Sequence, residues 1–60
     1  MNGNAVIEIL VNYGANEEIA KKYVNECEFS EGTGFWANNF SNAMEVIADF
    51  NLYNENGGLD

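Results

Sequence analysis

Apolar residues follow a helical spacing along residues 35–52, FWANNFSNAMEVIADFNL, and this stretch dominates the chain. Apolar side chains recur there at three- and four-residue steps, which places them on one side of an α-helix. They are Trp36, Phe40, Ala43, Met44, Ile47 and Phe50. The polar residues on the opposite side are Asn38, Asn42, Glu45 and Asp49. The pattern predicts one long helix whose aromatic stripe forms the centre of the core. The alternative is that Trp36, Phe40 and Met44 are partly exposed and bind a partner.

A second helix is predicted from residue 17 to about Glu28. Asn16 is its expected N-cap, and the two glutamates of the first turn suit the positive end of the helix dipole. Each of these glutamates precedes a lysine by four residues, which favours an ion pair along the helix. The apolar face consists of Ile19, Ala20, Tyr23, Val24 and Cys27.

Residues 5–13 are also predicted to form a helix, capped by Asn2 or Asn4 and ended by Gly14, which tolerates the left-handed conformation. The segment AVIEILV is rich enough in β-branched residues that a strand is the alternative.

Turn residues separate and follow these elements. Residues 29–34, FSEGTG, are predicted to be a loop, and residues 54–60, NENGGLD, a polar and mobile tail. The chain is therefore expected to be a single all-α domain, a small three-helix bundle, with an α+β fold as the alternative if residues 5–13 form a strand.

The charge of the chain is strongly one-sided. Ten acidic residues face two basic ones, which gives a formal net charge of −8. Such an anion is expected to repel nucleic acid and anionic membranes and to attract basic protein surfaces. The sequence begins with no signal-peptide pattern and contains no apolar run near the ~20 residues of a membrane span, so we expect a cytoplasmic protein.

No cofactor or metal site is expected, because the chain has no histidine and only one cysteine. Asp49, Asn51, Tyr53 and Asp60 match positions one, three, five and twelve of a calcium-binding loop. Asn54 stands at the sixth position, where the loop needs glycine, so calcium binding is not predicted.

Two further motifs lack an essential part. The segment GTGF, residues 32–35, precedes a helix as a phosphate-binding turn would, but it lacks the lysine of a P-loop. Cys27 has no histidine to activate it and lies on an apolar helix face, which predicts a buried structural thiol. We therefore predict that the protein is not an enzyme.

Residues 5–24, AVIEILVNYGANEEIAKKYV, resemble the first two helices of ubiquitin-associated domains. Tyr13-Gly14, Glu18 and Ala20 carry this resemblance, which covers about a third of the chain. The sequence after Ser30 departs from the family pattern, and the family is not assigned. In size and charge alone, the chain resembles the short acidic proteins that phages direct against host enzymes.

These features lead to two functional hypotheses. In the first, the protein is an inhibitor, of the kind that phages use, whose carboxylates occupy a basic, nucleic-acid-binding surface of another protein. The predicted partner-binding residues are Glu17, Glu18, Glu26, Glu28, Glu31, Asn38, Asn42, Glu45 and Asp49. In the second, it is a helical adaptor or dimerisation module that binds through apolar surface. Ile7 and Val11 lie away from the main apolar side of their helix, and we predict a homodimer with these two residues near its contact.

Overall fold

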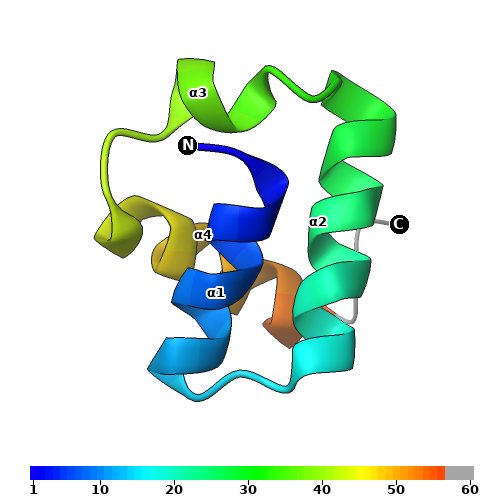
Figure 1. Ribbon diagram of the computed structural model, residues 1–60. Coiled ribbons are helices and arrows are strands. Elements are labelled where there is room, and N and C mark those ends of the chain that lie inside the picture. The colour runs from blue at the N-terminus through cyan, green and yellow to red at the C-terminus, as the bar shows by residue number, and fades with distance from the viewer. Residues whose placement is uncertain (57–60) are drawn as a thin grey trace.

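The computed structural model describes residues 1–56, and within that range the chain forms four helices and no strand. They are α1 (Gly3–Tyr13), α2 (Glu17–Glu31), α3 (Phe35–Asn39) and α4 (Ala43–Glu55). Figure 1 shows α1 and α2 side by side and antiparallel, with α4 crossing behind α1 and α3 linking the end of α2 to the start of α4. The all-α prediction is confirmed, and the alternative strand at residues 5–13 is wrong.

Asparagine and glycine set the ends of α1, as predicted. Asn2 is the N-cap, and its side chain accepts a hydrogen bond of 2.9 Å from the backbone N–H of Ala5. Gly14 takes the left-handed conformation, with φ of 116°, and the next N–H, that of Ala15, bonds to the carbonyl of Leu10 at 2.9 Å. This six-to-one bond belongs to the Schellman motif, which satisfies carbonyls that would otherwise lack partners.

The single helix predicted over residues 35–52 is wrong, because the chain breaks between α3 and α4. Phe40 is extended, with φ of −130° and ψ of 126°. Asn42 then starts α4 as its N-cap and accepts a hydrogen bond of 3.1 Å from the N–H of Glu45. The Glu45 carboxylate in turn accepts from the N–H of Ser41 at 3.1 Å. These capping bonds favour a new helix start over continuation of the apolar spacing.

Two other predicted boundaries also shift. The predicted loop at residues 29–34 starts later, because α2 continues to Glu31. Gly32, with φ of 88°, is the C-cap of this helix. Phe29 is therefore a helical residue. α4 extends to Glu55, so the first part of the predicted mobile tail is helical, and residues 57–60 lie outside the described residues.

Aromatic rings surround Tyr23 at the centre of the core. Its ring centroid lies 5.5 Å from that of Trp36, 5.3 Å from Phe50 and 5.1 Å from Tyr53. Such tilted and edge-on contacts stabilise aromatic pairs beyond the area they bury. Ile19, predicted to belong to the buried face of α2, is instead 39% exposed. The buried core consists of Val6, Leu10, Ala20, Tyr23, Val24, Cys27, Trp36, Val46, Phe50 and Tyr53.

The buried face of α4 is rotated relative to the prediction. Val46, Phe50 and Tyr53 are buried, whereas Met44 is 74% exposed and Ile47 only packs against the edge of the core. The predicted stripe assumed one continuous helix from Phe35. Because α4 begins again at residue 43, its orientation is set by its own packing against α1 and α2.

Candidate functional site

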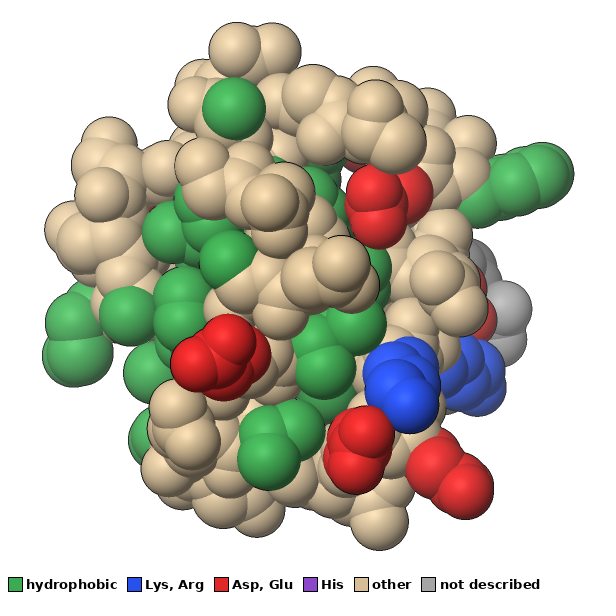
Figure 2. Space-filling view, viewed as in Figure 1, with side chains coloured by type: hydrophobic (Ala, Val, Ile, Leu, Met, Phe, Trp, Pro, Cys, Tyr) green, Lys and Arg blue, Asp and Glu red, His purple; other side chains and the backbone are tan. Residues whose placement is uncertain are grey.

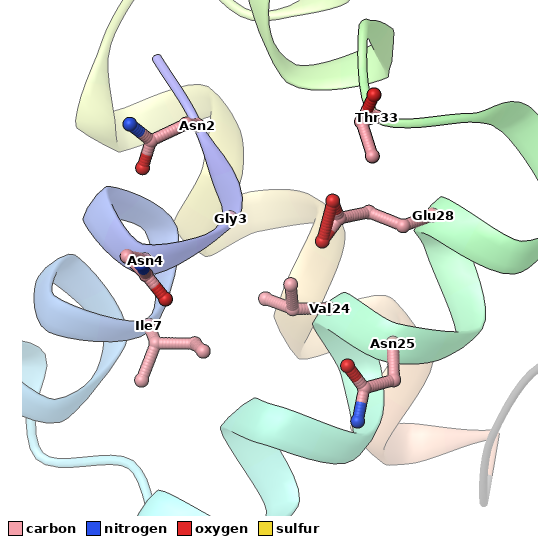
Figure 3. Close-up of a pocket in the computed structure, with 8 residues that line it drawn as sticks. All are labelled: Asn2, Gly3, Asn4, Ile7, Val24, Asn25, Glu28 and Thr33. Atoms are coloured by element: carbon pink, nitrogen blue, oxygen red, sulfur yellow. The ribbon is translucent and has the colours of Figure 1, made fainter.

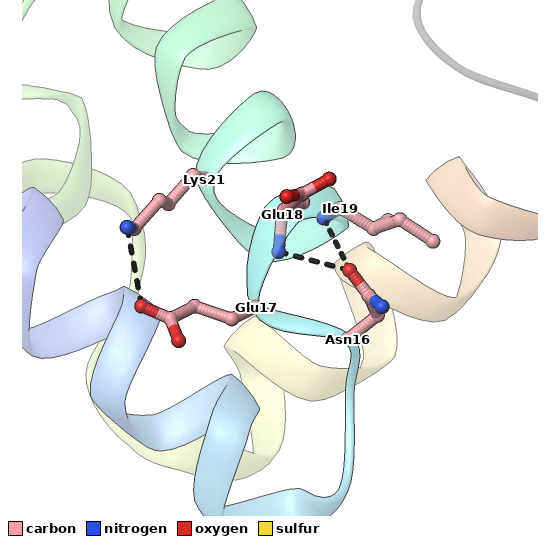
Figure 4. Close-up of polar contacts among 5 residues, drawn as sticks. All are labelled: Asn16, Glu17, Glu18, Ile19 and Lys21. Carbon is pink, nitrogen blue, oxygen red and sulfur yellow. Dashed lines mark hydrogen bonds and ion pairs between the residues drawn. The ribbon is translucent and has the colours of Figure 1, made fainter.

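Acidic side chains are spread over the described surface, and few of them meet a cation. Between residues 1 and 56 one ion pair forms, from Lys21 Nζ to Glu17 Oε2 at 3.1 Å (Figure 4). The second predicted pair, Glu18 with Lys22, does not form there. Figure 2 shows the acidic groups of one face standing apart, with the two lysines together. The exposed acids are Glu8, Glu17, Glu18, Glu31, Glu45 and Glu55, and the half-buried ones are Glu26, Glu28 and Asp49.

The predicted partner-binding carboxylates of α2 do not form one continuous face. Glu28 turns toward the start of α1, where a Cβ on Gly3 would lie 2.6 Å from its Oε1. Glu26 stands two residues earlier, which is about 200° around a helix, so its side chain leaves from a different side. The structure thus divides the predicted set between two sides of α2.

Asp49 was predicted to lie on a solvent-facing polar side, and this is wrong, because it faces the buried Tyr23. The Tyr23 hydroxyl donates a hydrogen bond of 2.6 Å to Asp49 Oδ2. Burial, and then this bond to Asp49, raise the pKa of Tyr23 far above its ordinary value. Asp49 therefore has a structural role between α2 and α4.

Cys27 is buried and free, as predicted. Burial, followed by the negative charge of Asp49, raises the pKa of the Cys27 thiol to about 11. The thiolate is the nucleophilic form of cysteine, and at neutral pH this thiol stays protonated. The geometry thus gives Cys27 no activating base and an environment that opposes its reactive form.

Two predicted site residues hold the start of α4. Asn42 is its N-cap, and the Glu45 carboxylate accepts a hydrogen bond from the N–H of Ser41. At the start of α2, the predicted N-cap Asn16 accepts hydrogen bonds of 2.9 and 3.1 Å from two backbone N–H groups (Figure 4). In contrast, Asn38 on α3 and Glu31 at the end of α2 are exposed. Of the predicted set, these two and Glu18 are the exposed members that make no side-chain hydrogen bond or ion pair within residues 1–56.

A polar cleft of about 400 Å³ opens between the start of α1 and α2. Figure 3 shows Glu28 extending from α2 toward Gly3, with Ile7 below them. A carboxylate beside the first turn of a helix is stabilised by the helix dipole, so Glu28 serves the packing of α1 on α2. The cleft is lined by Asn2, Gly3, Asn4, Ile7, Val24, Asn25, Glu28 and Thr33.

No group of three or more histidine, cysteine or acidic side chains among residues 1–56 has the arrangement of a metal site. The calcium-loop match fails structurally, because Asp49, Asn51 and Tyr53 lie within helix α4; Asp60 lies outside the described residues. The turn in the segment GTGF leads into α3, which is only five residues long, and this gives the phosphate-binding interpretation no support.

Two large apolar side chains are more exposed than the core prediction allows. Phe29 is 94% exposed. Met44, which was assigned to the core stripe with partial exposure as the alternative, is 74% exposed and shares an outer stripe of α4 with Ala48 and Leu52. The spacing of four residues among these three would have revealed the stripe if α4 had been started at residue 43. Phe29 falls opposite the buried face of α2 once that helix is extended through residue 31.

The two predicted dimer residues differ in their surroundings. Ile7 is half-buried and packs against the core, and Val11 is 40% exposed on α1. Their contact with a second copy stays a prediction.

No family model, no curated protein and no solved structure matches this chain. The resemblance of residues 5–24 to ubiquitin-associated domains therefore rests on the quoted residues alone. Within residues 1–56, no helix is both long and apolar enough to cross a membrane.

Proposed function

We propose that this protein is a non-enzymatic inhibitor that acts in the cytoplasm, by occupying a basic, nucleic-acid-binding surface of another protein. One observation carries the proposal: six exposed and three half-buried carboxylates on a compact helical scaffold meet a single ion-paired lysine among residues 1–56. Carboxylates held apart on rigid helices imitate the spaced charges of a phosphate backbone, and they compete for the lysine and arginine side chains that hold phosphates.

The chemistry of the described residues agrees with a binding role. The one cysteine is buried with a raised pKa, and Asp49 is engaged by Tyr23. The remaining acids are held on three helices of fixed relative position. Charge of this density steers a basic partner at long range and raises the association rate.

The residues suited to a binding test are fewer than the partner-binding residues predicted from the sequence. Asp49, Asn42 and Glu45 make hydrogen bonds that hold the fold, so changing them would confuse binding with stability. Glu18 and Glu31 are exposed and make no such bonds within residues 1–56, and they are the proper residues to test.

The test measures affinity against salt. A partner is captured from an extract of the source cell and purified, and its Kd is measured between 50 and 300 mM salt, a range over which phosphate-like contacts weaken steeply. For the parent protein, the logarithm of the association constant should fall linearly with the logarithm of the salt concentration. The Glu18→Gln, Glu31→Gln double variant should bind about two- to thirtyfold more weakly, from roughly 0.2–1 kcal/mol for each charge.

A matched control separates local contacts from overall charge. The Glu8→Gln variant removes one charge from α1, and this side chain is also exposed. It should lose less affinity than the Glu31→Gln single variant does. An affinity that stays flat with salt in all of these proteins would refute the charge-based function.

A second candidate function is a helical adaptor that binds through apolar surface. The observation that favours it is the outer stripe of α4, where Met44 is 74% and Leu52 59% exposed, with Ala48 between them. In that case the Met44→Ser, Leu52→Ser double variant should not bind the partner, and the affinity of the parent protein should not change with salt.

A further inference from the structure

Phe29 is the most exposed large apolar side chain of the described residues. It is 94% exposed, although it belongs to the last turns of α2 and the opposite side of this helix carries Tyr23, Val24 and Cys27 into the core. A phenylalanine in this position adds almost no burial to the fold, because burial is proportional to the apolar area removed from water. Aromatic side chains are enriched in the buried centres of protein interfaces, where such a ring gains its contacts from a partner.

The Phe29 ring borders an open hollow of about 420 Å³, which it shares with Asn25, Glu26 and Ser30. Glu26 is half-buried, and its Oε2 atom is shielded from solvent without a hydrogen-bond partner among residues 1–56. A charged oxygen without a partner is costly, and a rotation of the half-buried Glu26 side chain toward the hollow would let a bound cation or donor reach it. Lys22, one turn earlier on the same helix, makes no ion pair with Glu26.

We propose that Phe29 and Glu26 together form a docking point for an arginine side chain of a basic partner protein. A guanidinium group stacks on an aromatic face and donates paired hydrogen bonds to a carboxylate, and it is more weakly hydrated than an ammonium group. The hollow offers the ring and the carboxylate on neighbouring turns of one helix. This inference rests on the proposed function, whose basic partner supplies the arginine.

Charge decides between a foreign partner and a second copy. The chain has a net charge of −8, no arginine and two lysines, both on α2. Two copies would bring like charges together at this surface, which opposes association. A cationic partner instead gains attraction from the whole acidic surface as well as from Glu26.

The docking point can be tested without knowing the partner. Capped hexa-arginine and hexa-lysine peptides are titrated into the ¹³C-labelled protein at fixed salt, and the Phe29 ring and Glu26 carboxyl resonances are followed by NMR. Hexa-arginine should shift both resonances in a saturable way and bind about two- to fivefold more tightly than hexa-lysine, a factor expected from a cation–π contact at an exposed site.

Four variants complete the test. Phe29→Leu keeps an apolar side chain but removes the π face, and Glu26→Gln keeps the shape but removes the charge; each should erase the preference for arginine. Lys22→Gln removes the cation that lies one turn before Glu26 on α2 and should tighten hexa-arginine binding more than Lys21→Gln, the same charge change on a different side of α2. Because Phe29 is exposed, Phe29→Leu should melt like the parent, which keeps the test valid if Glu26→Gln folds poorly.

Equal binding of the two peptides, or an arginine preference that survives in Phe29→Leu, would overturn the docking point. Absence of saturable binding to either peptide would overturn it as well. The proposed function stands or fails separately, on the salt dependence measured with Glu18→Gln, Glu31→Gln, since both of those residues lie outside the hollow.

Discussion

The hydrogen bond from Tyr23 to Asp49 gives a sharp test of how this small core is held together. Tyr23→Phe removes one oxygen atom and leaves a ring that can keep the contacts with Trp36 and Phe50. The loss of stability therefore measures the bond, and the lost packing adds little to it. Val46→Ala, by contrast, would open a cavity and mix several effects.

The magnitude follows from the charge and burial of the two groups. A hydrogen bond to an ionised group contributes about 1.5–3 kcal/mol, and removing one partner leaves the other without compensation. Asp49 is only half-buried, so water replaces part of the lost bond and the lower half of that range is expected. In a domain of this size, a loss of about 1.5–2 kcal/mol lowers Tm by roughly 6–16 °C.

Urea unfolding, followed by far-UV circular dichroism and by the fluorescence of the buried Trp36, measures this loss. Tyr13→Phe is the matched control, because it removes the same atom from a tyrosine that is 55% exposed and accepts only a long bond of 3.4 Å from Asn51. The control should lose less than about 0.5 kcal/mol. If Tyr23→Phe unfolds like the control, the bond between α2 and α4 does not stabilise the fold.

The raised pKa values of the neighbouring Tyr23 and Cys27 predict how stability responds to alkaline pH. The folded pKa values of Tyr23 and Cys27 are raised above their unfolded values, to about 11 for Cys27. The unfolded state therefore releases protons first as pH rises, and stability falls from near pH 9 upward. Tyr23→Phe removes one of the two groups, so its stability should decline less steeply above pH 10 than that of the parent. A parent whose stability is constant from pH 8 to pH 11 would contradict this reasoning.

Two further predictions concern the core and association. Phe50→Ala should lower the free energy of unfolding by about 3–5 kcal/mol and unfold much of the protein. Phe40→Ala and Ile47→Ala should lower it less, because both side chains are only partly buried, and Met44→Ala should hardly change it. Thermal melts of the four variants give the order of stability. Sedimentation at micromolar concentration should show a dimer that Val11→Asp dissociates, and a monomer in both proteins would remove the dimer contact from consideration.

The first two helices could be predicted from the sequence because their end signals are local. Asn16 and Gly14 act on backbone groups within a few residues, and the same bonds are found in the structure. The apolar faces of α1 and α2 also follow the helical period. Local capping chemistry and a periodic face agree there, which is the condition under which sequence patterns determine an element.

The second half of the chain was predicted less well, because two signals disagree. The spacing from Trp36 to Phe50 fits one helix, but Asn42 offers a cap in the middle of it. The cap prevails, and the face of α4 turns so that Met44 points outward. The role of Asp49 could not be read from the sequence either, since its partner lies 26 residues away on another helix.

The candidate site illustrates the same limit. Net charge follows from composition, and the surface position of Glu18 follows from helix periodicity. Glu31 was predicted to lie in a loop, whereas it is the last residue of α2. The packing of the helices decides which carboxylates make hydrogen bonds within the protein, as Asp49 and Glu45 do. Only the structure shows that packing. The exposure of Phe29 was missed because α2 was ended one turn too early.

The position of two carboxylates supports the proposal that the acidic surface binds a basic partner. Glu31 and Glu55 are the last residues of α2 and α4, and no described helix carries a basic residue in its last turn. The carboxyl end of a helix is negative, so each of these side chains opposes folding by roughly 0.3–1 kcal/mol. A domain of 60 residues has only about 3–9 kcal/mol of stability to lose. Solubility would be served as well by carboxylates at the amino ends, where the dipole stabilises them. Acids that cost stability where they stand therefore agree with the proposed basic partner, which is why Glu31 belongs in the salt-dependence test.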